Sequence, residues 1–403
     1  MFPFVLLTLE VVLLSAFDRK IYGTYYTPTI FLAIPYYLML LTAICTNNYL
    51  GFYNIYFPSI YVWCIGLFLF WITGFIMSTI ILKKTIVEKY PFKFSISKNT
   101  EKIILFTSTI TAIVSNINVF RGYRIFGEFG GEDFEAYLGS GLTAHIAVFL
   151  RFLSVFSFIY ISFSNGKKLR ALCHLFVIIS ALFFCMAYTT KSSLLITLLS
   201  GIIARLAIRN KKIKIKWIFP TIVLAFLVFF ISYSLVFGYA APFDFIVHHT
   251  LYYFTAGISG LSYYIQHNLA TGISLDMLFM PIVNLYNKLS GQPTQVVISQ
   301  LWTPVGVDQS SNVKTFFGTI YIYGGIWGGI FTTIIWSFLC HLLFILSRKK
   351  NIFFFITYII FLTSLLFGWF DLFFNMITFY EFLLYGLIFG CIYSLRKYYK
   401  YEH

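Results

Sequence analysis

Long apolar stretches alternate with short polar ones along almost the whole chain. Each apolar stretch runs for about 20 residues, the length that a helix needs to cross the hydrocarbon core of a bilayer. Strands of an outer-membrane barrel would instead alternate polar and apolar residues at every second position. The stretches lie at residues 1–17, 25–46, 55–82, 103–120, 138–163, 169–189, 192–208, 217–238, 315–346, 352–370 and 375–395. This pattern predicts an all-α polytopic membrane protein with about eleven transmembrane helices.

The composition agrees with that fold class. Hydrophobic residues make up 59% of the chain and charged residues 11%, whereas a soluble protein carries about 25% charged residues. All six cysteines lie within apolar stretches, and no Cys-x-x-Cys pair occurs. We therefore expect the cysteines to be small core residues, and we expect neither a disulfide framework nor a thiolate metal site.

Basic residues cluster in alternate polar segments, which sets the orientation by the positive-inside rule. The clusters are Arg19–Lys20, Lys83–Lys102, Lys167–Arg170, Arg205–Lys216, Arg348–Lys350 and Arg396–Lys400. Eleven spans with these clusters in the cytoplasm place the N-terminus outside and the C-terminus inside. Because basic residues follow the first apolar stretch, we expect a first span there rather than a cleaved signal peptide. The net charge of +15 thus follows from topology and does not indicate nucleic-acid binding.

Six basic residues fall outside those clusters. They are Arg121, Arg124, Arg151, Lys191, Lys288 and Lys314. All except Arg151 are expected on the outer side, where the rule disfavours them, and Arg151 lies midway along the fifth span, where a cation is costly and by default indicates function. Structural alternatives remain, because Lys191 and Lys314 could snorkel and Arg151 could pair with Glu10 or Glu381. Together the six predict an anion-binding site at the outer face.

Two outer segments are long enough to contribute structure. Residues 121–140 combine two arginines, four acids and five glycines, and residues 239–314 form the largest non-spanning segment. A structureless loop of the second length would be unusual, so we expect it to contain helices or re-entrant pieces. Within it, Phe243–Gln266 is aromatic and half apolar, which favours a helix lying along the membrane interface. The expected domains are therefore residues 1–238, 239–314 and 315–403.

The outer histidines and acids are the candidate general bases. His248 and His249 begin the expected interfacial helix and could act as general bases near neutral pH. Histidines also occur in amphipathic interfacial helices without a catalytic role. The other candidates are His145, His267, Asp244, Asp276, Asp308 and Asp371. No zinc-ligand spacing occurs, and the cytoplasmic loops are too short for a nucleotide-binding domain. Any chemistry is therefore expected at the outer face, without a metal or nucleotide cofactor.

The segment Asn312–Gly329, NVKTFFGTIYIYGGIWGG, resembles a recurring segment of Wzy-type polysaccharide repeat-unit polymerases, the O-antigen and capsule polymerases. The matching positions are Asn312, Val313, Thr315, Tyr321, Gly325 and Gly328. Gly318 and Tyr323 depart from it, because the family often has an arginine and an aspartate there, and Lys314 is a candidate substitute for the arginine. A second stretch, Thr190–Leu195, looks like the family's Gly-Arg-Ser/Thr-x-Leu, with Lys191 in place of the arginine.

The resemblance implies a GT-C-like enzyme that polymerises lipid-linked oligosaccharides at the periplasmic face of the bacterial inner membrane. The growing glycan would leave undecaprenyl diphosphate and pass to a sugar hydroxyl of the next lipid-linked unit. The donor and acceptor lipids, the bilayer, a chain-length regulator and a flippase would be its partners. An O-antigen ligase and a polysaccharide flippase or transporter are the alternatives.

The implied roles follow from the charges of these residues. The predicted diphosphate-binding residues are Arg121, Arg124, Arg151, Lys191 and Lys314, and the predicted catalytic residues are His248, His249 and Asp308. We further expect Lys314 in the first turn of the ninth span, where free helix N–H groups would bind an anion. A polar cap followed by a snorkelling lysine is the alternative there. Glycines 324, 325, 328 and 329 predict close helix packing.

Overall fold

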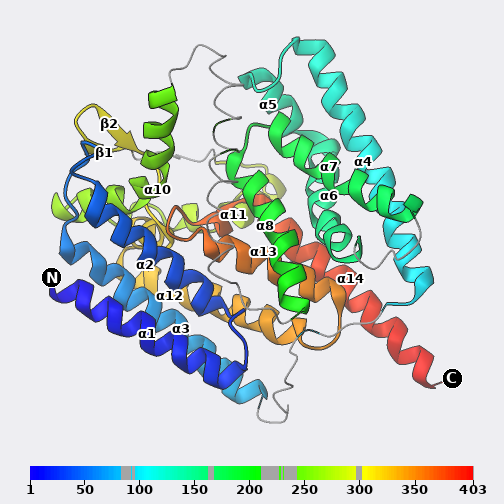
Figure 1. Cartoon of the computed structure of the whole chain (residues 1–403), viewed down its shortest axis with the longest axis horizontal. Helices are drawn as coiled ribbons and strands as arrows, with labels where there is room; N and C mark the ends of the chain where they lie inside the picture. The colour runs from blue at the N-terminus through cyan, green and yellow to red at the C-terminus, as the bar shows by residue number, and fades with distance from the viewer. Residues whose placement is uncertain are drawn as a thin grey trace. The chain divides into compact units, whose positions relative to one another are not determined.

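The computed structural model describes residues 1–82, 92, 96–161, 168–209, 227, 230, 243–295 and 302–402. This part of the chain is almost wholly helical (Figure 1). Eight of its helices are long and apolar enough to cross a membrane. The chain is therefore an all-α protein of the polytopic membrane class, as predicted. The predicted span 217–238 lies almost entirely outside the described residues.

The helices follow the predicted apolar stretches closely. They are α1 (Phe2–Tyr22), α2 (Pro28–Thr46), α3 (Ile60–Leu82), α4 (Lys98–Phe126), α5 (Glu132–Leu138), α6 (Gly141–Tyr160), α7 (Lys168–Ala187), α8 (Lys191–Ile208), α10 (Phe243–Gln266), α11 (Met280–Leu289), α12 (Phe316–Ser347), α13 (Ile352–Leu366) and α14 (Ile377–Glu402). Short 3-10 turns are η1 (Phe57–Ser59), η3 (Leu275–Leu278) and η4 (Phe373–Asn375). Ten predicted spans thus coincide with α1–α4, α6–α8 and α12–α14, although α13 has only 15 residues.

The chain forms two compact units, each assembled from separate stretches of sequence. Unit 1 comprises residues 1–91, 247–345 and 364–380, and unit 2 comprises residues 92–246, 346–363 and 381–403. This division cuts across the three consecutive domains expected from the sequence. The large outer segment belongs mostly to unit 1, with the N-terminal helices and α12.

Aromatic side chains and indole hydrogen bonds build the core of unit 1. Trp63 of α3 is fully buried and stacks on Tyr36 of α2 with ring centroids 3.4 Å apart. Its Nε1–H donates to Thr315 Oγ1 over 3.0 Å. Buried Trp side chains usually need such a partner, so this contact fixes the residue just before α12 against α3.

The large outer segment contains α10, η3, α11 and an antiparallel hairpin of β1 (Thr303–Gly306) and β2 (Gln309–Ser311). The predicted helix Phe243–Gln266 is confirmed as α10. Residues 255–262 of α10 are all buried, because Gly257 and Gly260 allow neighbouring backbone to approach closely. A Cβ at Gly257 would lie 2.5 Å from the carbonyl oxygen of Phe370. The middle of α10 is therefore enclosed by protein, which the sequence analysis did not predict.

Helix α12 is broken at Gly325, which the sequence analysis did not predict. Gly325 has φ 60° and ψ −157°, a region open essentially to glycine alone. The backbone N–H of Gly272 donates to the carbonyl oxygen of Ile322 over 2.7 Å, so a loop residue pairs with a carbonyl beside the break. A Cβ at Gly324 would lie 2.7 Å from the amide nitrogen of Gly329 in the same helix, and a Cβ at Gly328 would lie 2.9 Å from Leu275 of η3. These contacts lie at the break and against η3, and they are not the packing between long helices that was expected.

Unit 2 is built on the neighbouring helices α4, α6, α7 and α8 (Figure 1). Helix α5 closes one end of this group, where Phe134 and Leu138 are fully buried against Val119, Ala147 and Phe184. The outer segment 121–140 is thus not an open loop. It consists of the last turns of α4, which carry Arg121 and Arg124, followed by α5.

Candidate functional site

Lys314 lies in unit 1 and is closed off from solvent. Its side chain is 4% exposed, and its Nζ donates to the carbonyl oxygen of Ser311 over 2.8 Å. It precedes α12 and is not in its first turn, which corrects the sequence expectation. The amides of Thr315 and Phe316 donate to the carbonyl oxygens of Phe370 and Gly368 over 2.9 and 2.7 Å. The N–H groups that were expected to bind an anion therefore already donate hydrogen bonds to backbone carbonyl oxygens.

Asp371, beside Lys314, accounts for the position of that lysine. Asp371 Oδ1 accepts hydrogen bonds from Thr319 Oγ1 over 2.5 Å and from the amide of Leu372 over 2.8 Å. Burial raises the pKa of Asp371 to about 6, although the nearby positive charge of Lys314 opposes the rise. Burial likewise lowers the pKa of Lys314 to about 8, against the attraction of Asp371. The two form a buried, mutually stabilising pair between the chain before α12 and the chain after α13.

Asp371 should make the stability of the protein depend on pH. Its folded pKa of about 6 lies above the ordinary 3.8, so the folded state binds the proton more tightly. The stabilisation is present below about pH 4 and is lost as the pH rises through 6, a difference on the order of 3 kcal/mol. We expect the melting temperature of the wild type in detergent to fall over this window.

Asp371→Asn should remove that dependence, because the amide keeps the hydrogen bond from Thr319 and does not titrate. Asp276→Asn is the matched control, since Asp276 is exposed. An Asp371→Asn protein whose melting temperature falls as steeply as that of the wild type would refute this account of the pair.

The three predicted catalytic residues belong to unit 1, on α10 and on the hairpin, and Tyr252 of α10 donates a hydrogen bond to the carbonyl oxygen of Ser310 in that hairpin. Asp308 is exposed at the tip of the hairpin with φ 56°, a conformation that aspartate tolerates in turns. His248 and His249 lie near the start of α10, and their side chains are outside the described part of the structure. The turn explains Asp308 without a catalytic role.

The other residues predicted to bind the diphosphate all belong to unit 2, whereas Lys288 is exposed on α11 of unit 1. Arg121 and Arg124 are exposed on the last turns of α4, and Lys191 is the half-buried first residue of α8. Glu135 of α5 attracts Lys191 electrostatically and accepts a hydrogen bond from Thr189. Burial raises the pKa of Glu135, and the neighbouring Glu132 raises it further. Lys191 therefore already has a carboxylate close by.

Arg151 is the least compensated cation in the described part of unit 2. Its side chain is 6% exposed, its Nε donates to Thr197 Oγ1 over 3.0 Å, and its guanidinium carbon lies 5.3 Å from the centre of the Phe382 ring. Among the described residues of unit 2, no carboxylate lies within ion-pair distance of it. A buried charge with only a neutral hydroxyl partner is costly. The proposed pairing with Glu381 does not occur, because Glu381 pairs with His145.

His145 of α6 and Glu381 of α14 form a pair that the sequence analysis did not identify. His145 Nδ1 lies 3.0 Å from Glu381 Oε1. The Tyr385 hydroxyl donates to Glu381 Oε2 over 3.1 Å and is 3.3 Å from the carbonyl oxygen of His145. His145 is 53% exposed and Glu381 13%, so an open histidine is held by a more enclosed carboxylate. We call His145, Glu381 and Tyr385 the histidine–glutamate cluster.

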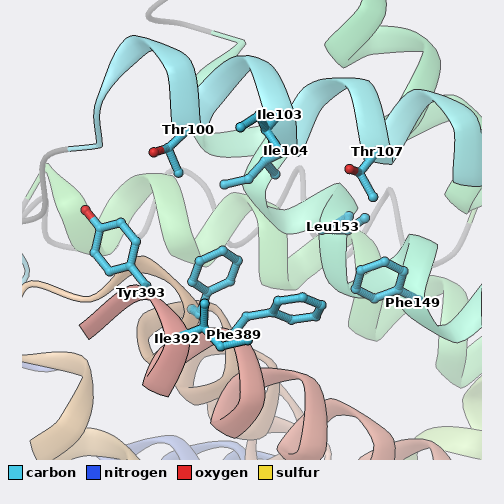
Figure 2. A pocket seen from close by; sticks show the side chains of 10 residues that line it. Thr100, Ile103, Ile104, Thr107, Phe149, Leu153, Phe389, Ile392 and Tyr393 are labelled. Carbon is cyan, nitrogen blue, oxygen red and sulfur yellow. The ribbon is translucent and has the colours of Figure 1, made fainter. Parts of the chain in front are cut away.

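An apolar groove with a volume of about 180 Å³ lies in unit 2 among α4, α6, α13 and α14. Figure 2 shows Ile104 and Thr107 of α4 facing Phe389 and Ile392 of α14 across it. Phe149 also lines the groove, and its ring lies 4.9 Å from that of Tyr385. Phe149 therefore belongs to the lining of the groove and also contacts Tyr385 of the histidine–glutamate cluster.

Residues 51–399 match a family described as a family of unknown function (DUF6337), and the chain belongs to that family. No curated protein and no solved structure matches the chain.

Proposed function

We propose that this member of the DUF6337 family is a membrane glycosyltransferase that uses a prenyl-diphosphate-linked glycan as its donor. In the proposed reaction, the growing glycan leaves undecaprenyl diphosphate and is joined to the next lipid-linked repeat unit at the periplasmic face. The observation that carries the proposal is Arg151, a buried cation in a membrane-type helix whose only hydrogen-bonded side-chain partner in the described structure is the hydroxyl of Thr197.

An anionic ligand would supply the negative charge that Arg151 lacks among the described residues of unit 2. A guanidinium can bind phosphate oxygens through two parallel N–H donors, and Arg151 commits only Nε to Thr197. A diphosphate leaving group gains negative charge as the glycosidic bond breaks, so a fixed cation stabilises the transition state more than the ground state. The reaction therefore requires positive charge at the diphosphate, and basic side chains can provide it.

The other cations predicted to bind the diphosphate lie together with acids. Arg121 and Arg124 lie on the end of α4 that is followed by α5, and Lys191 begins α8 beside Glu135 of α5. Four acids, Glu128, Glu132, Asp133 and Glu135, lie in the same segment. The proposal therefore rests on Arg151 and not on a local excess of positive charge.

The apolar groove suits the hydrocarbon chain of such a lipid. Its lining is largely aliphatic and aromatic, and Figure 2 shows the hydroxyl of Tyr393 toward one end. Phe389 lies eight residues beyond Glu381 on α14, a distance of about 12 Å along a helix. A prenyl chain in the groove could therefore extend along α14 toward Arg151, whose guanidinium lies over Phe382.

A transporter of lipid-linked glycans is the second candidate, and one observation favours it. Transporters often bind their substrates at discontinuous helices, and α12 is broken at Gly325. A transporter would move the lipid without changing the glycan, so chain length separates the two candidates.

The surface polysaccharide of a strain lacking this chain tests the proposal. A polymerase predicts that single repeat units remain attached to their acceptor while long chains disappear. Complete loss of surface glycan would instead indicate a ligase or a transporter. Unchanged long chains would contradict all three functions.

A further inference from the structure

We infer that His145 is the general base that deprotonates the acceptor hydroxyl, with Glu381 as the residue that positions it. This inference rests on the proposed glycosyl transfer and adds the catalytic group that the proposal lacks. The juxtaposition that carries it is an exposed histidine of α6 that is bonded through Nδ1 to a more enclosed carboxylate of α14, with Arg151 further along α6 and its guanidinium over Phe382 of α14.

The hydrogen bonds of the histidine–glutamate cluster fix which nitrogen can accept a proton. Nδ1–H donates to Glu381 Oε1, which leaves the lone pair on Nε2. Tyr385 donates to the other carboxylate oxygen and so holds the glutamate in place. A carboxylate on one ring nitrogen sets the tautomer and stabilises the imidazolium that forms after proton transfer. A histidine held in this way is ready to act as a base through Nε2.

The base and the anion-binding residue approach consecutive residues of α14. His145 contacts Glu381, and the guanidinium of Arg151 lies over the ring of Phe382. On α6, Arg151 lies six residues after His145, which is about 9 Å along the helix axis. In the inferred arrangement, the diphosphate contacts Arg151, the acceptor hydroxyl is held at His145, and the reacting carbon lies between them.

The other candidate bases in the described structure are less suitable. Asp308 is exposed at the hairpin tip, in a turn conformation. Asp371 belongs to unit 1, and its Oδ1 already accepts two hydrogen bonds. Among the histidines with described side chains, His145 has a carboxylate that orients its ring.

The step can be written with all atoms accounted for. The acceptor hydroxyl oxygen attacks the anomeric carbon of the donor sugar, and its proton passes to His145 Nε2. The bond between that carbon and the diphosphate oxygen breaks, and its electron pair stays on the diphosphate beside Arg151. The imidazolium then returns its proton to water, and no oxidant or further reactant is needed.

The titratable side chains that face His145 in the described structure are Glu381 and Tyr385 of α14, with Arg151 further along α6. Glu381→Gln should lower the transfer rate and leave the affinity for undecaprenyl diphosphate unchanged, because the ring of His145 loses the carboxylate that orients it. A purely structural tie between α6 and α14 would instead lower the melting temperature and leave the transfer rate of the folded protein unchanged.

The test uses the full-length protein in nanodiscs, with undecaprenyl-diphosphate-linked oligosaccharide as donor and acceptor. His145→Gln should lower the transfer rate at least about 100-fold and should leave the affinity for undecaprenyl diphosphate unchanged. His267→Gln is the matched control, because His267 is also exposed and its ring lies against Tyr263. It should transfer at the wild-type rate.

The outcomes separate this inference from the proposed function. A His145→Gln protein that transfers normally overturns the role of His145 and leaves the function standing. A wild-type protein that binds no prenyl diphosphate and transfers no glycan overturns both. If His145→Gln does not fold, a Glu381→Gln protein that transfers at the wild-type rate overturns the inference, and one that transfers more slowly with unchanged affinity for undecaprenyl diphosphate supports it.

Discussion

Replacement of Arg151 by methionine should weaken the binding of undecaprenyl diphosphate by about 10- to 150-fold and should abolish glycan transfer. Hydrogen bonds to a charged group contribute about 1.5–3 kcal/mol each, and 1.4 kcal/mol corresponds to a factor of ten in affinity. Methionine keeps a long apolar side chain in place of the guanidinium that lies over Phe382, and it removes the charge. Binding to the purified protein in nanodiscs measures the effect.

The same substitution should not lower stability, and this distinguishes a binding role from a structural one. Arg151 has no ion-paired carboxylate among the described residues of unit 2, so its removal leaves no carboxylate unpaired there. Replacing an uncompensated buried charge by an apolar side chain is often neutral or stabilising. We therefore expect an equal or higher melting temperature together with weaker binding.

Arg170 provides the matched control. It is a second arginine of unit 2 but has a carboxylate partner, with Nη1 3.1 Å from Glu101 Oε1. Arg170→Met should affect stability more than binding. Arg151→Lys should retain only part of the affinity, because the bidentate fork is lost. A lower melting temperature and unchanged binding in Arg151→Met would show that the residue is structural.

The second large effect concerns the break in α12. Gly325→Ala should destabilise the protein by at least about 1–3 kcal/mol, because its backbone lies in a region that a Cβ makes unfavourable. If α12 straightened to relieve this strain, the hydrogen bond from Gly272 to the carbonyl oxygen of Ile322 would be lost. Thermal unfolding in detergent measures the loss.

Gly329→Ala is the control for that substitution, in the same helix and four residues further on. A Cβ there would meet atoms no closer than 3.8 Å, which is ordinary van der Waals contact. Its stability should match the wild type or exceed it slightly, since alanine favours a helix more than glycine does. Equal stabilities for the two variants would mean that the break at Gly325 does not exist in the folded protein.

The sequence was sufficient for the helices and largely insufficient for the contacts between them. The length of an apolar stretch is a local property of the sequence, so ten predicted spans coincide with helices. The expected helix Phe243–Gln266 has the bounds of α10. The enclosure of α10 was not predictable in the same way. It depends on Phe370, which lies more than a hundred residues further along the chain.

The candidate site shows the same limit residue by residue. Arg151 was identified because a cation within an apolar span is unusual whatever surrounds it. The partner of His145 was not identified, because Glu381 lies 236 residues away in the sequence and only the packing of α6 on α14 brings them together. The prediction that free N–H groups beside Lys314 bind an anion was wrong in the described structure. The N–H groups of Thr315 and Phe316 already donate to backbone carbonyl oxygens of the segment after α13.

Reconstitution of glycan transfer from purified components tests the central proposal most directly. The protein is placed in nanodiscs with a lipid-linked oligosaccharide repeat unit, without nucleotide, and the products are separated by length. The account predicts a ladder of longer lipid-linked glycans, with one undecaprenyl diphosphate released for each unit added, and no ladder from Arg151→Met. Glycans that stay one repeat unit long with the folded, lipid-binding wild type would contradict it.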